Sequence, residues 1–353
     1  MSALRRFAVL LAGALLSAAT TLAATQSEVV ELAKQVAGGI PSARAELERL
    51  AGEGDALAAH YLGRLYLVGK GVPQNEVLAV EWFQKAAAKG DVASAHDLGV
   101  IYERSRGPLR NLEEARRWYG IAAEKGYASS QANLGSMLLQ GIGGPANIDE
   151  ARAWIEKSAA QGDPRGRYLL GLLTLDGRAG IARNAAEAVR LLTLAAEGKD
   201  RDAQLRLARI YSSGEWLEKN PKLALEWLRK AAAQRQPEAE FMLAAVYASG
   251  LYGVKRDDKQ AAELLRSSAR AGNVEAQYQL GLAYAEGRGV PRDATEAYGW
   301  MLFASRNGHS KATEFVRQVQ SARERSAPPP RLPDGDQPAA APPGKDAPAE
   351  NKP

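Results

Sequence analysis

The sequence predicts an all-α protein, an α-solenoid of stacked helix-turn-helix hairpins. One pattern of small, apolar and aromatic residues returns about every 36 residues along most of the chain. Within each copy the apolar residues follow helical spacing. Alanine and leucine, which favour helices over strands, dominate the composition. Because one hairpin cannot bury its apolar face alone, stacked copies must share a continuous core.

The first 24 residues have the pattern of a secretory signal peptide. Arg5 and Arg6 precede Phe7–Ala19, an apolar run of 13 residues, and small residues follow it. This run is shorter than the roughly 20 residues that span a bilayer. We therefore expect cleavage near Ala23 or Ala24 and a protein that is secreted or remains in the periplasm. The alternative is an uncleaved anchor, which would be the protein's only membrane contact.

Residues 25–54 are predicted to form an N-terminal cap. Ala43, Leu47 and Leu50 have the spacing of one helix face, and Gly54 ends this half-repeat. Residues 28–36 predict a further helix before it.

Residues 55–308 contain seven copies of the pattern. In the first copy, Ala58, Leu62 and Tyr66 lie at i, i+4 and i+8, on one face of a first helix. Gly63 removes a side chain, so a neighbouring helix can come close. We interpret Trp82, on the second helix, as the large side chain that fills the space left by nearby alanines.

Three positions of the pattern keep their residue type through much of the chain, and we call each such set of equivalent positions a column. The glycine column admits only Gly or Ala. Glycine inside a helix costs about 1 kcal/mol relative to alanine, so its recurrence indicates that tight packing offsets this cost. Five of the six tryptophans fall in one column. The columns include Gly63, Gly99, Gly135 and Gly281; Tyr66, Tyr102 and Tyr284; and Trp82, Trp118, Trp154, Trp227 and Trp300.

A Gly-x-Gly loop joins the two helices in several copies. Gly287-Arg288-Gly289 resembles part of a phosphate-binding loop, but Arg292 stands where a dinucleotide fingerprint requires its third glycine. No strand is predicted before the loop, and it recurs in other copies. We therefore interpret it as a structural bend, with Asp293 placed to cap the following helix.

The C-terminal end is predicted to have two parts. Residues 309–325 read as a polar capping helix. Residues 326–353 hold nine of the 17 prolines and too little apolar surface to offset the entropy of ordering. They predict a flexible, partly polyproline-like tail.

The repeated motif is Ala-x-x-x-Leu-Gly-x-x-Tyr-x-x-Gly-x-Gly-Val-x-x-(Asp/Asn), followed by Ala-x-x-Trp and Ala-Ala-x-x-Gly. It resembles the Sel-1-like repeat, a relative of the tetratricopeptide repeat, over about residues 41–308. The resemblance implies a right-handed superhelix and an adaptor role. Members in bacterial envelopes take part in exopolysaccharide assembly or its regulation, in host contact, and in holding complexes together.

By analogy with tetratricopeptide proteins, the column three residues before the glycine column is expected to line a concave groove. The positions four and seven residues after it are expected to line the same groove. This column varies between copies while the packing columns stay constant, as a groove with several distinct contacts would. An equally open interpretation is that its aromatic residues complete the packing between helices. The candidate partner-binding residues are His60, Arg64, His96, Tyr168, Leu172, Arg209, Phe241, Tyr278 and Leu282.

Several functional classes lack support in the sequence. Without cysteine the chain has no disulfide, thiolate site or Cys nucleophile. His60 and His96 are stacked copies of one position, but a closed zinc site needs four ligands, so we predict no metal. Common catalytic motifs are missing, so we predict neither an enzyme nor a cofactor. The charges form no basic block, so no nucleic acid is expected.

These observations favour a non-catalytic envelope scaffold that binds another protein, such as an envelope complex or a membrane sensor. The alternative is a protein that binds, or also hydrolyses, peptidoglycan or another polysaccharide, with its aromatic groove residues stacked on sugars.

Overall fold

The computed structural model describes residues 26–326, and this part of the chain contains helices and no strands. The predicted signal segment and nearly all of the predicted tail lie outside the described residues. The all-α solenoid is confirmed. Before the repeats come a helix over residues 26–37 and α2 (Pro41–Gly52). The seven predicted copies follow as seven helical hairpins.

Every hairpin consists of two 13-residue helices. Short 3-10 turns, η1 (Gly107–Leu109) and η2 (Leu251–Gly253), lie in two of the connecting loops. The hairpins are α3 (Ala56–Val68) and α4 (Glu76–Ala88); α5 (Val92–Arg104) and α6 (Leu112–Glu124); α7 (Ala128–Gln140) and α8 (Ile148–Ala160); α9 (Pro164–Asp176) and α10 (Ala185–Glu197); α11 (Arg201–Ser213) and α12 (Pro221–Ala233); α13 (Pro237–Ser249) and α14 (Asp258–Arg270); α15 (Val274–Glu286) and α16 (Ala294–Arg306).

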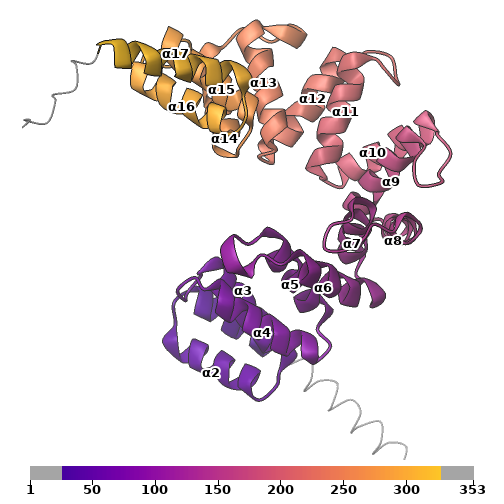
Figure 1. The fold of residues 1–353 in the computed structure, drawn as a ribbon. Coiled ribbons are helices and arrows are strands. Elements are labelled where there is room, and N and C mark those ends of the chain that lie inside the picture. The colour runs from indigo at the N-terminus through magenta and orange to yellow at the C-terminus, as the bar shows by residue number, and fades with distance from the viewer. Residues whose placement is uncertain (1–25, 327–353) are drawn as a thin grey trace, which may run out of the picture. The chain divides into compact units, whose positions relative to one another are not determined.

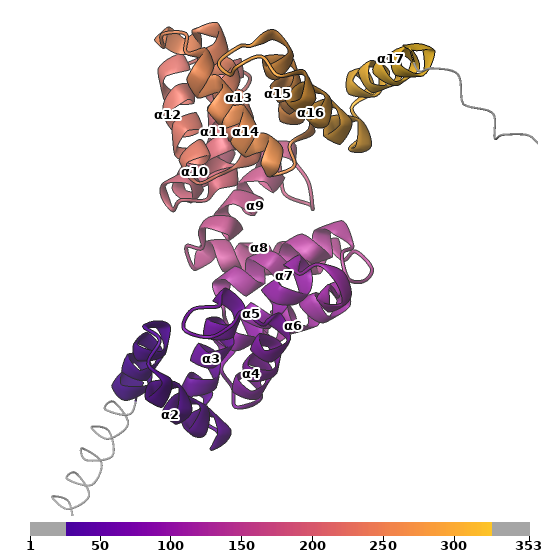
Figure 2. The same ribbon diagram turned by 90° about the vertical axis from the view of Figure 1, so that its left-hand side faces the viewer.

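The described chain forms two compact parts. The first contains the residues up to Leu243 together with Leu251–Val254, and the second contains Ala244–Gly250 and the residues from Lys255 onward. Within the first part, the helices from α2 to α12 each pack against the next one in the chain (Figure 1). Within the second part, α14 to α16 do the same, and α17 (Ser310–Ser326) packs on α16 as the predicted capping helix (Figure 2).

Aspartate and asparagine side chains fix where the helices begin. Asp91 accepts a hydrogen bond from the backbone N–H of Ser94 at 2.6 Å, at the start of α5. Asp293 accepts from the N–H groups of Thr295 and Glu296 at the start of α16, as its position in the sequence predicts. Such caps satisfy N–H groups that the first turn of a helix leaves without partners.

The glycine column makes room for the residue after the tryptophan, a contact that the sequence pattern did not reveal. A Cβ added at Gly63 would lie 2.8 Å from the ring of Phe83, which is fully buried. Trp82 borders the same core but stays partly exposed, with the Lys85 ammonium 3.9 Å from its ring centroid. The facing pairs are Gly63–Phe83, Gly99–Tyr119, Gly135–Ile155, Gly171–Leu192 and Gly281–Met301.

Hydroxyl groups of the tyrosine column form hydrogen bonds with the helix that precedes their hairpin. The Tyr66 hydroxyl donates to Glu48 at 3.1 Å and accepts from Arg44, and both partners lie on α2. In the last repeat, Arg266 of α14 donates to the hydroxyl of Tyr284 at 3.0 Å. These tyrosines lie on the first helix as predicted, and their hydroxyl groups tie the stacked hairpins together.

The second glycine of the Gly-x-Gly loop is also an inter-repeat contact. A Cβ at Gly143 would overlap the Leu112 carbonyl, at the start of the preceding repeat's second helix. Gly289 meets Asp258 in the same way. Both glycines also have positive φ, +69° and +70°, which L side chains rarely adopt. The loop is therefore a packing element, as its recurrence in the sequence indicates.

Candidate functional site

His60, a predicted groove residue, is buried in the first compact part. Its Nδ1 lies 2.9 Å from Ser94 Oγ on the next first helix and 3.4 Å from an Asp91 carboxylate oxygen. Its ring is 5.7 Å from that of Phe83. The side chain therefore connects two repeats and presents little surface to a partner.

His96 occupies the equivalent position in the second repeat. Its Nδ1 lies 2.8 Å from Ser130 Oγ, and its ring packs 4.8 Å from that of Tyr127. Burial lowers the pKa of the imidazole. Among residues 26–326, no three or more His, Cys, Asp or Glu side chains gather to hold a metal ion.

The carboxyl group of Asp97 is predicted to make the free energy of unfolding depend on pH. Burial raises the pKa of its carboxyl, with a smaller raising effect from Asp91, while His60 and Arg64 oppose the shift. A folded-state pKa above the unfolded value, about 3.9, penalises the native state once both states are ionised, and the penalty disappears below that value. Asp97→Asn should therefore unfold at higher denaturant than the wild type at pH 7, and at an equal concentration near pH 3.

The matched control for this measurement is Glu81→Gln, which removes an exposed carboxylate from α4. Denaturant midpoints of all three proteins across pH 3–7 would check the prediction. A constant difference between Asp97→Asn and wild type over that range would contradict it.

The remaining groove candidates have different environments. Arg64 is exposed on α3, and Phe241 is half-buried on α13. Tyr278 and Leu282 lie in the second compact part, where both pack against the core beneath α17. The Tyr278 ring stacks on His309 with centroids 4.2 Å apart, and His309 accepts from Ala312 N–H at the start of α17. For Tyr278 and Leu282 the packing interpretation fits the contacts better.

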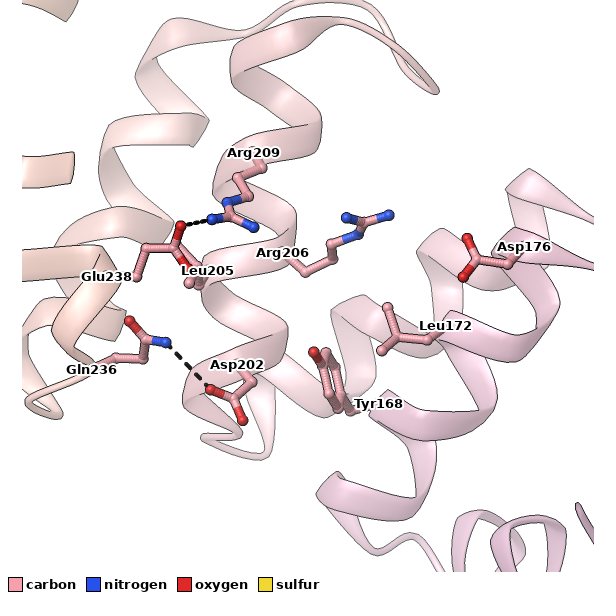
Figure 3. A pocket seen from close by; sticks show the side chains of 9 residues that line it. All are labelled: Tyr168, Leu172, Asp176, Asp202, Leu205, Arg206, Arg209, Gln236 and Glu238. Atoms are coloured by element: carbon pink, nitrogen blue, oxygen red, sulfur yellow. Dashed lines mark hydrogen bonds and ion pairs between the residues drawn. The ribbon is translucent and has the colours of Figure 1, made fainter. Parts of the chain in front are cut away.

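Three candidates, Tyr168, Leu172 and Arg209, come together at one pocket (Figure 3). The pocket has a volume of about 310 Å³ and lies between the first helices α9 and α11 and the segment that begins α13. Burial raises the pKa of Tyr168, and the Arg165 guanidinium lies 5.0 Å from its ring centroid. The pocket lining is Tyr168, Leu172, Asp176, Asp202, Leu205, Arg206, Arg209, Gln236 and Glu238.

Most charges in this pocket are paired. Arg209 forms an ion pair with Glu238. Asp202 accepts from Arg165 at 2.7 Å and from the Gln236 amide at 3.5 Å. Arg206 is different: its buried Nε donates to no acceptor in the described part of the chain.

The comparison with known families agrees with the repeat geometry. A model of the Sel1 repeat matches seven consecutive segments, which together run through residues 56–309. This chain belongs to the Sel1 repeat family. The matched segments are residues 56–91, 92–127, 128–163, 164–200, 201–235, 237–273 and 274–309.

Solved Sel1 repeat proteins are similar to this one. The Sel1 repeat protein from Oxalobacter formigenes is 27% identical, over 83% of this chain and 86% of that one, with a TM-score of 0.55. A protective antigen of uropathogenic Escherichia coli strains, described as having an SLR fold, is 28% identical over 84% and 75% of the two chains, with a TM-score of 0.44. None of the curated proteins matches the sequence. Sel1 repeats generally mediate protein–protein interaction.

The pocket of this Sel1 repeat protein contains residues that sequence reasoning missed. Arg206 precedes the predicted groove residue Arg209 by three residues, and Asp202 precedes it by seven. The groove analogy selected positions four and seven residues after the column and passed over both. The sequence carries no signal that would have selected Arg206, because its half-buried position is visible only in the structure.

Within residues 26–326, every helix is too short or too polar to traverse a bilayer.

Proposed function

We propose that this Sel1 repeat protein is a non-catalytic scaffold that binds a partner protein on the surface formed by its first helices. The observation that carries the proposal is the pocket between α9 and α11. There the buried Nε of Arg206 has no hydrogen-bond partner among the described residues, and Tyr168 and Leu172 line the same space. By contrast, the glycine, tyrosine and post-tryptophan columns contact neighbouring helices. An aromatic ring beside an arginine is typical of residues that dominate binding energy.

We further propose that the scaffold works in the periplasm or outside the cell. The basic start, short apolar run and small residues of positions 1–24 support this location. The partner would then be an envelope complex or a membrane sensor, in exopolysaccharide assembly, its regulation or host contact.

Binding of peptidoglycan or another polysaccharide is the alternative. A pocket lined by Tyr168, Asp176 and Asp202 supports it, because sugar hydroxyl groups need acceptors and sugar rings pack on aromatic faces. Titration with cell-wall fragments, followed by the fluorescence of the purified protein and by product analysis, tests this alternative directly.

Site-specific photo-crosslinking tests the scaffold function. A photoreactive amino acid would replace Arg64 or Asp176, two exposed positions on first helices. The matched control is Val77, which is 54% exposed on the second helix α4. In cells that produce the protein, we expect one discrete protein adduct from the first-helix positions and far less of it from Val77.

Two results would contradict the scaffold function. Equal adducts from first and second helices would show that the first helices carry no selective surface. If none of the positions gives an adduct while cell-wall fragments bind, the polysaccharide alternative replaces it.

A further inference from the structure

We propose that the pocket between α9 and α11 is a carboxylate-binding site that receives a peptide carboxylate of the partner next to an apolar side chain. This inference rests on the scaffold function proposed above and adds the chemistry of the group that is recognised. Its starting point is Arg206, the one cation lining this pocket that makes no ion pair (Figure 3).

Arg206 has a buried N–H group that can donate to a ligand. Its side chain extends from α11 toward α9, the helix that carries Tyr168 and Leu172 (Figure 3). A buried N–H without an acceptor destabilises the protein, and an acceptor supplied by a ligand recovers this energy. The guanidinium offers several N–H groups in one plane, which matches the two oxygens of a carboxylate.

The neighbouring charges explain why a ligand with one negative charge fits. Arg209 is neutralised by Glu238, and Arg165, just outside the lining, is engaged by Asp202. Arg206 is therefore the one lining guanidinium left for a ligand carboxylate, and the exposed Asp176 carboxylate on α9 keeps the total charge of the pocket near zero. A phosphate, with up to two negative charges, would meet the carboxylates of Asp202 and Asp176 with only Arg206 to balance it.

The other walls indicate what accompanies the carboxylate. Tyr168, Leu172 and Leu205 line the pocket beside Arg206 and present apolar surface. The volume of about 310 Å³ is at the lower end for small-ligand sites, which suits one residue and its carboxylate. Asp176 lies on the same helix as Tyr168 and supplies an acceptor for a ligand N–H.

The test uses the full chain and small probes with and without the carboxylate. The probes are N-acetyl-leucine, which imitates a chain end, N-acetyl-glutamic acid α-amide, which imitates an acidic side chain, and the neutral N-acetyl-leucinamide. Nitrogen-15 NMR of the arginine Nε–H groups reports on Arg206 directly. We expect its signal to move with at least one carboxylate probe and to stay in place with the neutral amide.

Variants localise this effect. Arg206→Gln should weaken the carboxylate probe at least about tenfold, the loss of one charge-assisted hydrogen bond. Arg201→Gln, an exposed arginine on the same helix outside the pocket, should bind as the wild type does. Arg206→Lys keeps the charge without the planar arrangement of N–H groups and should bind with intermediate strength. The wild-type titration requires no variant, so a folding defect in Arg206→Gln leaves the test intact.

The outcomes separate this inference from the scaffold function. No movement of the Arg206 signal with either carboxylate probe, or equal movement with N-acetyl-leucinamide, overturns the carboxylate site. If adducts from Asp176 and Arg64 persist in that case, the scaffold function stands without it. Whichever carboxylate probe binds more tightly identifies a chain end or an acidic side chain as the source.

Discussion

Phe83→Ala is expected to lower the free energy of unfolding by about 3–5 kcal/mol, the range for truncating a buried aromatic side chain. Phe83 is fully buried in the core of the first repeat, against Gly63. Trp82→Ala should cost only about 1–2 kcal/mol, because that ring is partly exposed. This loss includes the contact between the ring and the Lys85 ammonium. Urea unfolding of the full chain, with hydrogen exchange of the first-repeat amides as the readout, measures both changes.

A double-mutant cycle makes this comparison independent of residue size. Gly63→Ala should destabilise the wild type, since its Cβ would lie 2.8 Å from the Phe83 ring. In the Phe83→Ala background the same change should be neutral or stabilising, because the obstacle is gone and alanine favours the helix by about 1 kcal/mol. A larger loss from Trp82→Ala than from Phe83→Ala, or additive effects in the cycle, would contradict this packing.

Gly143→Ala is expected to cost about 3 kcal/mol or more. The substitution places an L side chain at φ +69°, which costs about 1–2 kcal/mol. It also drives a Cβ into the Leu112 carbonyl of the preceding repeat, and overpacking of this kind adds about 1–3 kcal/mol.

Gly107→Ala is the matched control for Gly143→Ala. Its φ of +72° is nearly the same, but no atom lies within 4 Å of the added Cβ. The control should show only the backbone cost, so the difference between the two variants measures the inter-repeat contact. Equal destabilisation in chemical denaturation would mean that the loop matters for its conformation alone.

The sequence predicts much of the architecture because the repeat itself is a physical constraint. A column held at Gly or Ala through seven copies has to lie where helices approach closely, and the structure places Gly63 there. Recurrence likewise identified Gly287-Arg288-Gly289 as a bend, and short-range hydrogen bonding identified Asp293 as a cap. Each of these conclusions depends on neighbours along the chain or on the copy one period away.

The repeating pattern did not reveal which side chains contact a neighbouring helix. Trp82 and Phe83 are adjacent, and both positions recur as large apolar residues, but they point about 100° apart around the helix. The chemically constant tryptophan column drew attention, whereas the buried column changes between Phe83, Tyr119 and Ile155. A recurring residue type shows that a position matters and leaves its orientation open.

By itself the sequence determined the seven hairpins, their caps, their bends and the family of the chain, because all of these follow from local propensity and a fixed period. Only the tertiary structure decided that His60 is buried and that Tyr168, Leu172 and Arg209 share one pocket with Arg206. The physical reason is pairing. Whether a charged or aromatic side chain is satisfied or left available depends on partners that lie on other helices, and no periodicity along the chain records them.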